Sequence, residues 1–396
     1  MSQENKTFSL QIFLLTAIRL VVNTSIRMIY PFLPVFARAF GVSLNSISTA
    51  VTLRSFMGVL APIVAPIADQ HGRKAGMAVG VGMISLALGL VVFFPVFPAF
   101  CVSLSLVFFG LYIYLPAMQA FVSDQVVYQK RGKIIAITEL AWALSFILGM
   151  PLVALLIERY GWWSPYPVFT FLTVLGFIGI LVLIPGNPKY VAPKQHHLSA
   201  ILEILRTPSA LAALLMGLFF CVSNESVALV FGVWLEDSFG LKIAALGAAS
   251  AIIGLAELGG EGLTAWLVDR LGKRVSIRLG LILNCFFALL LPWIGSSVSG
   301  ALIGLFLFYI SFEFVVVSSL PLISEVFPHR RATLMGLFLS AISLGRAFGD
   351  ILAPKLYTHS FWLNAAAAVL FNLLALAALH YVRISAEEKP IKGSLT

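Results

Sequence analysis

Two short stretches decide the fold of this chain: residues 68–74, which read ADQHGRK, and residues 268–274, which read VDRLGKR. Each holds an aspartate, then a glycine three residues later, then two adjacent basic residues, and the two copies lie 200 residues apart. The same shift aligns further pairs, namely Gly149 with Gly349, Trp162 with Trp362 and, with one residue of slack, Asn23 with Asn224. Because these agreements share one offset, they indicate that the 396-residue chain contains two copies of one unit.

The composition is that of a membrane protein. Hydrophobic residues make up 60% of the chain and charged residues only 11%, with a mean hydropathy of +0.99, whereas a soluble chain carries about 25% charged residues. A helix needs about 20 mostly apolar residues to cross a bilayer. Segments close to that length lie at roughly 8–37, 43–68, 75–95, 98–122, 132–157, 162–185, 208–235, 244–268, 275–295, 299–322, 331–356 and 360–383. We therefore expect an all-α polytopic membrane protein with twelve transmembrane helices in two pseudo-symmetric six-helix bundles.

The basic residues predict the orientation of the chain, because Lys and Arg in short loops stay on the cytoplasmic side. With the N-terminus inside, eighteen of the 26 basic residues fall in inner loops and four in outer loops. The longest polar interruption, rich in Pro and basic residues, lies between the sixth and seventh spans. This predicts a first bundle, a cytoplasmic linker, a second bundle and a cytoplasmic tail at 1–185, 186–207, 208–384 and 385–396. We expect a multi-pass protein of the cytoplasmic (inner) membrane with both termini inside.

Several classes of function have no support in the residues. The three cysteines, Cys101, Cys221 and Cys285, lie in apolar runs without metal-ligand spacing, so we expect neither a disulfide scaffold nor a metal site. The net charge of +9 is dispersed among the spans, which argues against nucleic acid as a partner. The chain has no Walker sequence, nucleophile elbow or HExxH motif. We therefore expect no enzyme activity and no cofactor, and a monomer surrounded by lipid.

Charged residues inside the predicted spans are the best guide to a binding site. A charge at the centre of a span costs ~2.5–3.5 kcal/mol on insertion scales, so such residues usually face a cavity or a partner. In the first span, polar residues recur at steps of three or four and so share one face of the helix. We expect the substrate cavity to be lined by that face and by residues of the second and seventh spans, in full by Arg19, Asn23, Arg27, Tyr30, Arg54 and Asn224.

Acidic residues inside the spans predict coupling to protons, because burial favours the neutral form of a carboxyl group. The candidates are Glu225, Glu313, Glu139, Glu257 and Glu261, with Glu225 and Glu313 placed closest to the midplane. The alternative for these two is a permanent ion pair with an arginine across the cavity. Glu257 and Glu261 lie one turn apart, so one of them should be protonated or paired. Arg346 and Asp350, at positions i and i+4, are expected to form a local pair.

Over its whole length the chain resembles the major facilitator superfamily, whose signature after the second helix is an Asp, a Gly and paired basic residues. The matching residues are Asp69, Gly72, Arg73 and Lys74 and, after the eighth span, Asp269, Gly272, Lys273 and Arg274. The resemblance implies a gating role, in which the Asp faces the N-terminus of helix eleven and stabilises the outward-open state. For the basic residues, the alternative is that they only set the topology. The resemblance also implies that helices 3, 6, 9 and 12 are peripheral, and these are the spans without interior charge.

Within that superfamily, the general pattern is most similar to bacterial drug and metabolite proton antiporters. The fifth span carries Ser145, Gly149 and Pro151, a partial match to the antiporter motif, but Met150 separates the glycine from the proline and Ser145 replaces a glycine. The basic residue that drug antiporters carry shortly before Gly110 is missing from SLSLVFFG. Both departures weaken an assignment to drug export and leave the resemblance to the superfamily intact.

These observations predict a secondary active transporter that works by alternating access. We expect proton coupling and a small organic solute, with export favoured over uptake; arginines in the first two spans make an anionic or zwitterionic solute reasonable. One alternative is proton-coupled or facilitative uptake of a sugar or organic anion. Another, of a different class, is a receptor or scaffold without transport, or a lipid flippase, on the same fold.

Overall fold

A computed structural model describes residues 3–60, 72–126, 128–186 and 197–383 of the chain. All regular structure in these residues is helical. The first half contains α1 (Gln3–Arg27), α2 (Ile29–Phe40), α3 (Leu44–Met57), the short turn η1 (Gly58–Leu60), α5 (Arg73–Phe93), α6 (Phe97–Gln125), α7 (Tyr128–Leu144), the π-helical turn η2 (Ser145–Gly149), α8 (Met150–Tyr160) and α9 (Pro165–Leu183). The second half contains α10 (His197–Arg206), α11 (Pro208–Ala228), α12 (Phe231–Phe239), α13 (Ile243–Leu271), α14 (Lys273–Ile294), α15 (Val298–Val326), η3 (Pro328–Arg330), α16 (Arg331–Tyr357) and α17 (Phe361–Tyr381).

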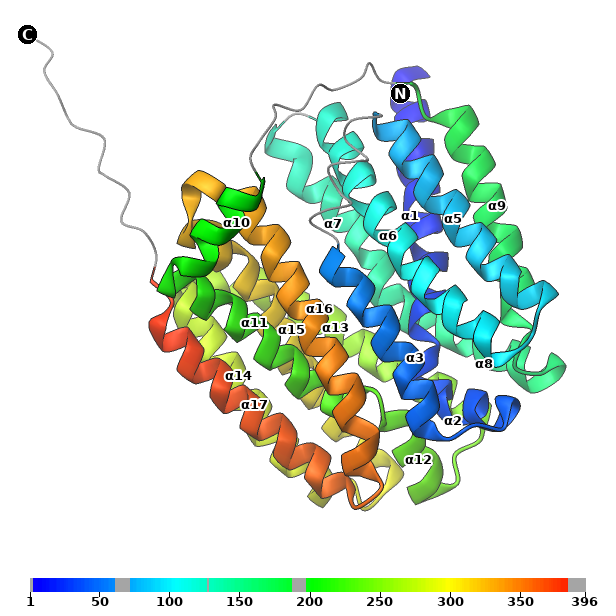
Figure 1. The fold of residues 1–396 in the computed structure, drawn as a ribbon, viewed down its shortest axis with the longest axis vertical. Helices are drawn as coiled ribbons and strands as arrows, with labels where there is room; N and C mark the ends of the chain where they lie inside the picture. The colour runs from blue at the N-terminus through cyan, green and yellow to red at the C-terminus, as the bar shows by residue number, and fades with distance from the viewer. Residues whose placement is uncertain (1–2, 61–71, 127, 187–196, 384–396) are drawn as a thin grey trace, which may run out of the picture.

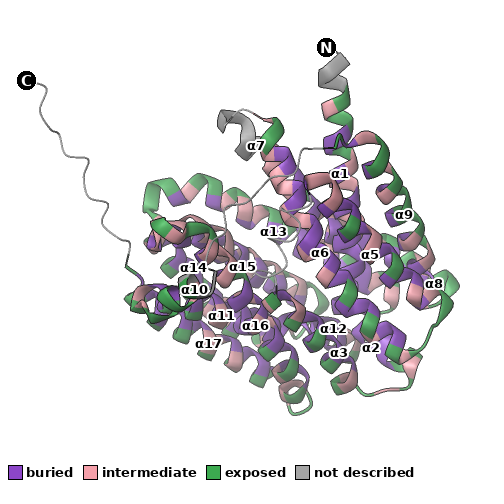
Figure 2. Ribbon diagram, turned by 45° about the horizontal axis from the view of Figure 1, so that its top comes forward, coloured by how far each residue is buried: buried purple, intermediate pink, exposed green. Residues whose placement is uncertain are grey.

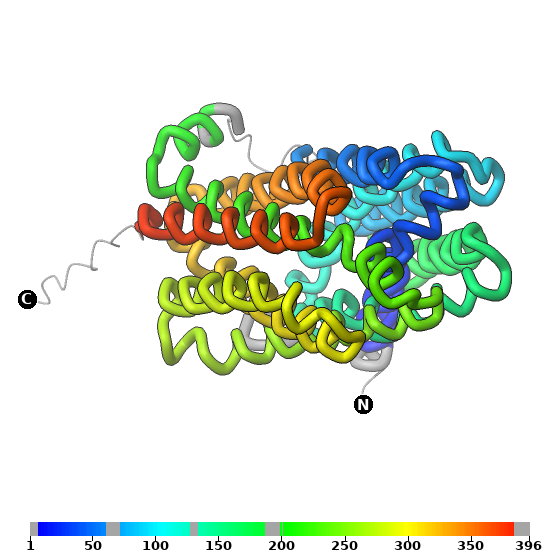
Figure 3. The backbone as a smooth tube through the Cα atoms, turned by 90° about the horizontal axis from the view of Figure 1, so that it is seen from below, coloured from blue at the N-terminus to red at the C-terminus, as the bar shows by residue number. Residues whose placement is uncertain are grey.

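The helices confirm an all-α polytopic membrane protein. Within the described residues, 11 helical segments are long and apolar enough to cross a membrane, and each overlaps one of the predicted spans. The remaining predicted span, 43–68, begins as α3 and η1 and continues into residues 61–71, outside the described part of the chain. Figures 1 and 3 show the helices of the two halves as two neighbouring groups. The division at 186–207 stays a prediction.

The first and seventh spans are each broken near their middle, at positions related by the repeat. α1 ends at Arg27 and α2 begins at Ile29, while α11 ends at Ala228 and α12 begins at Phe231. In the first span the cause is local, because Pro31 has no backbone N–H to donate and Pro34 follows one turn later. Phe32 between them is non-helical, with φ −107° and ψ 16°. The breaks turn α2 and α12 towards each other.

α2 and α12 cross at a single glycine. A Cβ atom on Gly232 would lie 2.5 Å from the carbonyl oxygen of Pro31 and 2.7 Å from that of Tyr30. Only a residue without a side chain therefore allows these two backbones to approach so closely. This crossing joins the halves close to the two breaks, and α2 and α12 continue from it to the end of the molecule where α2 ends and α3 begins, which we call the far face (Figure 1).

Two further helix pairs join the halves through small residues. α13 lies against α7, η2 and α8, where a Cβ on Gly254 would meet the carbonyl oxygen of Ala143 at 2.7 Å and one on Gly247 would meet the Cβ of Ala154 at 2.5 Å. α16 lies against α3 and η1, with Gly58 facing the hydroxyl of Ser343. Close approach at small residues is how helices pack in a bilayer, where there is little hydrophobic driving force between them.

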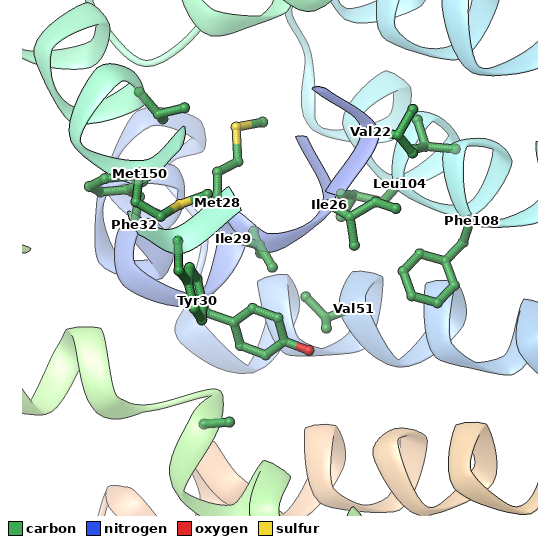
Figure 4. Packing of buried hydrophobic residues seen from close by; sticks show 14 of the residues in the cluster. Val22, Ile26, Met28, Ile29, Tyr30, Phe32, Val51, Leu104, Phe108 and Met150 are labelled. Carbon is green, nitrogen blue, oxygen red and sulfur yellow. The ribbon is translucent and has the colours of Figure 1, made fainter. Parts of the chain in front are cut away.

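Apolar side chains fill the interior and also cover the outside. Figure 4 shows Ile26 and Ile29, on either side of the α1–α2 break, near Val51 of α3 and Leu104 and Phe108 of α6. Exposed residues run along the outer surfaces of the helices in Figure 2 and include large apolar ones such as Leu86, Val182 and Trp293. In a soluble protein such a surface would aggregate; in a bilayer it contacts lipid.

In three of the four spans expected to be peripheral, most of the apolar window is not buried. Only 28% of the apolar window of α9 is buried, 33% of that of α17 and 39% of that of α14. The third span, α5, differs, because 61% of its window is buried. Its Gly80 faces the backbone of Gly110 and Tyr114 on α6, so these two helices pack closely, and α9 covers a further side. Lack of interior charge therefore does not by itself make a helix peripheral.

The α2–α12 crossing gives a first prediction. Gly232→Ala should lower the melting temperature of the purified protein, because the added methyl group forces the two backbones apart, and overpacking typically costs about 1–3 kcal/mol. The matched control is Gly262→Ala on α13, where a Cβ meets nothing within 4 Å, so helix propensity alone favours alanine. Differential scanning fluorimetry compares the two variants, and an unchanged melting temperature for Gly232→Ala would contradict the close crossing.

Candidate substrate and coupling site

The predicted polar face of α1 lies inside the protein. Arg19, Asn23 and Arg27 follow one another at four-residue steps, and each is at most 5% exposed. Tyr30, just beyond the break, is also buried. A charge in this position needs a partner, and the partners of these residues come from both halves of the chain.

Arg19 pairs with Glu139 of α7. The two guanidinium NH groups donate to the two carboxylate oxygens in a bidentate arrangement, with 2.6 Å between Nη1 and Oε1. Gln119 of α6 donates a further hydrogen bond to Glu139, at 3.1 Å. This cluster lies within the first half, and it binds Arg19 to its own bundle.

Arg27 connects the two halves. Its Nη2 forms an ion pair with Glu257 of α13, while its Nη1 donates to the carbonyl oxygen of Trp142 at 2.8 Å and to the hydroxyl of Ser145 at 3.2 Å. The guanidinium also lies 3.5 Å from the ring centroid of Phe146 and 4.1 Å from that of Trp142. The carbonyl of Trp142 also accepts a hydrogen bond from the Ser145 hydroxyl, at 2.6 Å, shortly before the π-helical turn η2 begins.

A second chain of contacts also crosses between the halves. Arg54 of α3, which is fully buried, donates to the hydroxyl of Tyr30 at 3.0 Å and to the carbonyl oxygen of Ile26 at 3.1 Å. The Tyr30 hydroxyl in turn donates to Glu225 of α11 at 3.2 Å, and Arg346 of α16 lies 3.6 Å from the same carboxylate oxygen. Glu225 thus receives one partner from each half.

The expected local pair of Arg346 with Asp350 does not form. Arg346 reaches Glu225 on α11 instead, and Asp350 faces α3, where its Oδ2 accepts a hydrogen bond from Ser55 at 2.6 Å and its backbone carbonyl accepts one from Ser48. The i,i+4 spacing allowed the pair, but contacts with neighbouring helices direct the two side chains apart. Asp350 is fully buried, and its Oδ1 has no hydrogen-bond partner in the structure.

Three acidic residues lie at or beside the contact between α13 and α15. Gly260 of α13 packs on α15, where a Cβ on it would lie 2.7 Å from the Cβ of Glu313. Glu257 is one turn before Gly260, and Glu261 directly follows it. Glu257 has Arg27 as its partner, Glu261 is partly exposed, and Glu313 is 8% exposed and forms no hydrogen bond or ion pair with any described residue. We call Glu257, Glu261 and Glu313 the acidic cluster.

The two asparagines expected in the cavity keep polar atoms without partners. Asn23 on α1 and Asn224 on α11 are 2% and 7% exposed, and the Nδ2 of the first and the Oδ1 of the second have no hydrogen-bond partner in the structure. An unpaired buried polar atom is costly, so these atoms are suited to a polar group of a bound solute.

The described residues of the two gating motifs make matching contacts. Arg73 pairs with Asp124 of α6 at 3.3 Å, and the repeat-related Lys273 pairs with Glu325 of α15. Their neighbours cap helix ends: Lys74 donates to the carbonyl of Leu181 at 2.7 Å, and Arg274 donates to that of Leu379 at 3.1 Å. Gly72 and Gly272 have φ values of 91° and 83°, which favour glycine. Asp269 is exposed, and Asp69 lies outside the described residues.

Sequence reasoning missed the residues that support the charged ones. Gln119, Trp142 and Phe146 contact Glu139 or Arg27, and Ser55 contacts Asp350. A signal existed for Gln119, because an amide inside an apolar span needs a partner, but none existed for Trp142, whose backbone carbonyl makes the contact.

No group of three metal-ligating side chains occurs in the described part of the chain. Two pockets of about 550 and 540 Å³ open at the far face around Asp237, away from all these charges.

The comparisons with known proteins agree with this architecture. The profile of the Major Facilitator Superfamily matches residues 15–350 and again residues 219–395, so the chain belongs to this superfamily of transporters and is not an enzyme. An uncharacterised MFS-type transporter of Bacillus subtilis, YceJ, is 22% identical over 95% of this chain and 96% of its own length. A homologue of the multi-drug resistance efflux pump PmrA from Lactococcus lactis is 25% identical over 68% of this chain and 69% of its own. The crystal structure of a D-xylose–proton symporter has the same fold, with a TM-score of 0.74 at 15% identity, covering 93% of this chain and 97% of that one.

The pair of Arg27 and Glu257 gives a second prediction. Arg27→Gln should lower the free energy of unfolding by about 3–5 kcal/mol, because it leaves the Glu257 carboxylate buried without its partner. The double variant Arg27→Gln/Glu257→Gln should recover much of that loss, since both charges are then gone. SDS-induced unfolding in mixed micelles measures these differences.

The control for this prediction is a pair at the far face. Arg38 and Glu236 also join the halves, but the Arg38 side chain is 60% exposed, and exposed ion pairs contribute about 0–1 kcal/mol. Arg38→Gln should therefore have little effect. Equal losses for Arg27→Gln and Arg38→Gln would contradict the assigned role of burial.

Proposed function

We propose that this secondary transporter exchanges protons for a small organic solute across the cytoplasmic membrane and works as an exporter. The observation that carries the proposal is the Tyr30–Glu225–Arg346 contact, in which a buried carboxyl group holds partners from both halves of the chain. In a carrier that works by alternating access, the two halves move against each other around a central site. A titratable group at their contact couples its protonation to that movement.

Glu225 is the centre of this coupling. Tyr30 of α2 and Arg346 of α16 contact it directly, and Arg54 and Arg27 add positive charge at longer range. When Glu225 is ionised, these groups hold α11, α2 and α16 together. A proton on Glu225 removes the charge that attracts Arg346 and weakens the bond from Tyr30, so the contact between the halves becomes easier to separate.

Glu313 is the second coupling group, in a different electrostatic setting. Its neighbours Glu257 and Glu261 are like charges, and Arg27 and Arg346 are the positive groups that act on it. Both like charges and burial favour the neutral form of a carboxyl group. A change in the charge of Glu313 would therefore be felt by its neighbours on α13, and positive charge that enters the site would favour its ionised form.

The unpaired amides support a solute site between the halves. Asn23 belongs to α1 and Asn224 to α11, and each presents an unsatisfied polar atom at the repeat-related depth. A solute that bonds to both side chains makes contact with each half. Export is favoured by the similarity to the Lactococcus relative, a homologue of a multi-drug resistance efflux pump.

We further propose that both termini lie in the cytoplasm, on the side of the loops that carry most of the basic residues. A green fluorescent protein fused after Thr396 should be fluorescent, and alkaline phosphatase at the same position should be inactive, because it folds only outside the cytoplasm. After Lys242, at the far face, the outcome should be reversed. The opposite pattern at the two positions would contradict this orientation.

The coupling proposal is tested by flux. A thermal-shift screen of cationic, anionic and neutral metabolites and drugs identifies a ligand, because binding to the folded state raises its stability. Proteoliposomes preloaded with that ligand should release it faster when a pH gradient is imposed. Glu225→Gln, which resembles the protonated residue, should abolish this acceleration but retain exchange of labelled for unlabelled ligand, since exchange needs no net proton transfer.

The matched control is Glu203→Gln, at an exposed ion pair between α10 and Arg330, which should keep full acceleration. Glu313→Gln is expected to behave like Glu225→Gln in release. If collapsing the gradient leaves release unchanged, and both Gln variants release ligand as fast as the wild type, proton coupling is excluded. Binding without any flux would instead indicate a receptor.

A further inference from the structure

We propose that the solute is a lipophilic organic cation and that its positive charge binds at the acidic cluster of Glu257, Glu261 and Glu313. The inference deepens the proposed function by naming the class of substrate, and it rests on the same central site. It follows from a comparison of the arginines and the acidic residues in the interior of the protein.

The arginines are already engaged by the protein. Arg19 is held by both oxygens of Glu139, Arg27 by Glu257 and the Trp142 carbonyl, and Arg346 by Glu225. Arg54 donates to Tyr30 and Ile26. At Arg19, Arg27 or Arg346 an anionic solute would have to displace a carboxylate and leave it without its partner. Arg54 has no carboxylate partner, and its Nε, like that of Arg19, has no hydrogen-bond partner in the structure. Of the three arginines that suggested an anion from the sequence, Arg19 and Arg27 are therefore poorly placed to bind one.

Carboxyl groups are in excess in the same region. Six acids lie on the interior faces of the helices, and three of them, Glu139, Glu225 and Glu257, have an arginine partner. The other three have none within ion-pair distance among the described residues, namely Glu261, Glu313 and Asp350. Asp350 has two serine contacts on α3, so the unmet negative charge is concentrated on α13 and α15.

Glu313 is the residue that makes the cluster a binding site. It is nine-tenths buried, has no hydrogen-bond partner among the described residues and faces Gly260, between Glu257 and Glu261. Glu257 has one oxygen, Oε2, that is buried and unpaired. A buried carboxylate oxygen without a donor is costly, and a cation that binds there removes that cost at Glu257 and balances the charge of Glu313.

The surroundings select an organic cation rather than a metal ion. The described residues contain no group of three acidic, His or Cys side chains close enough to hold a metal ion, so the carboxylates are too far apart to coordinate one directly. An organic cation is larger and can therefore lie between carboxylates that a metal ion could not reach at the same time. Close to Glu313 the contact between α13 and α15 is apolar, with the Ile310 side chain 3.0 Å from a Cβ on Gly259, so a cation that binds here must itself carry apolar surface.

The test uses two ions of similar shape and opposite charge, tetraphenylphosphonium and tetraphenylborate. Equilibrium dialysis of the purified full-length protein with each labelled ion at pH 7.5 should show saturable binding of the phosphonium and none of the borate. Glu313→Gln should weaken phosphonium binding by at least about tenfold, which corresponds to about 1.4 kcal/mol. Glu313→Asp, which keeps the charge, should restore most of the affinity.

The control variant is Glu158→Gln at the exposed far face, which should bind the phosphonium like the wild type. The melting temperature of each variant without ligand shows whether it is folded, and the Asp variant separates loss of charge from loss of structure. The inference is wrong if the phosphonium does not bind, if the borate binds equally well, or if folded Glu313→Gln binds the phosphonium as tightly as the wild type.

This outcome is independent of the coupling test. Charge-selective binding that depends on Glu313, together with flux that ignores a pH gradient, would support the cation site and refute proton exchange. Proton-driven release of a neutral or anionic ligand, together with no binding of the phosphonium, would support the proposed function and refute the cation site.

Discussion

The ion pair between Arg27 and Glu257 joins the two halves inside the membrane-spanning region. Each charge lies inside a membrane-spanning helix, where an unpaired charge is costly, and each comes from a different half of the chain. Trp142, Phe146 and Ser145 hold the guanidinium in position from α7 and η2. The relative placement of α1, α7 and α13 is therefore set by the need of one arginine for all of its partners.

The halves approach each other at small residues, with Gly232 against Pro31 and Gly254 against Ala143, and the polar bonds among them are few. Packing of this kind depends on close approach of backbones rather than on interdigitated large side chains. Such an interface suits the alternating access proposed above, in which the two halves move against each other.

The two halves share their architecture but not their charge. The gating contacts are repeated, as Arg73 with Asp124 and Lys273 with Glu325. At the centre, the three buried arginines all belong to the first half, whereas the second half supplies Glu225, Glu257, Glu313 and Asp350. Opposite charge attracts the halves to each other and still leaves an excess of carboxylates on α13 and α15. The halves thus share their helices and gating contacts, while single side chains make the centre polar and asymmetric.

The sequence by itself determined the helices, their approximate bounds and the repeat, because a span of about 20 apolar residues and a signature at a fixed offset are local patterns. It also determined that Arg19, Asn23 and Arg27 share one face, since helical periodicity needs no knowledge of neighbours. Only the tertiary structure decided which charges are partners. Arg346 turns to Glu225 rather than to Asp350, and Trp142 contributes a backbone carbonyl, because these contacts depend on how separate helices approach. The same is true of α5, whose lack of charge suggested a peripheral helix until Gly80 was found against Gly110.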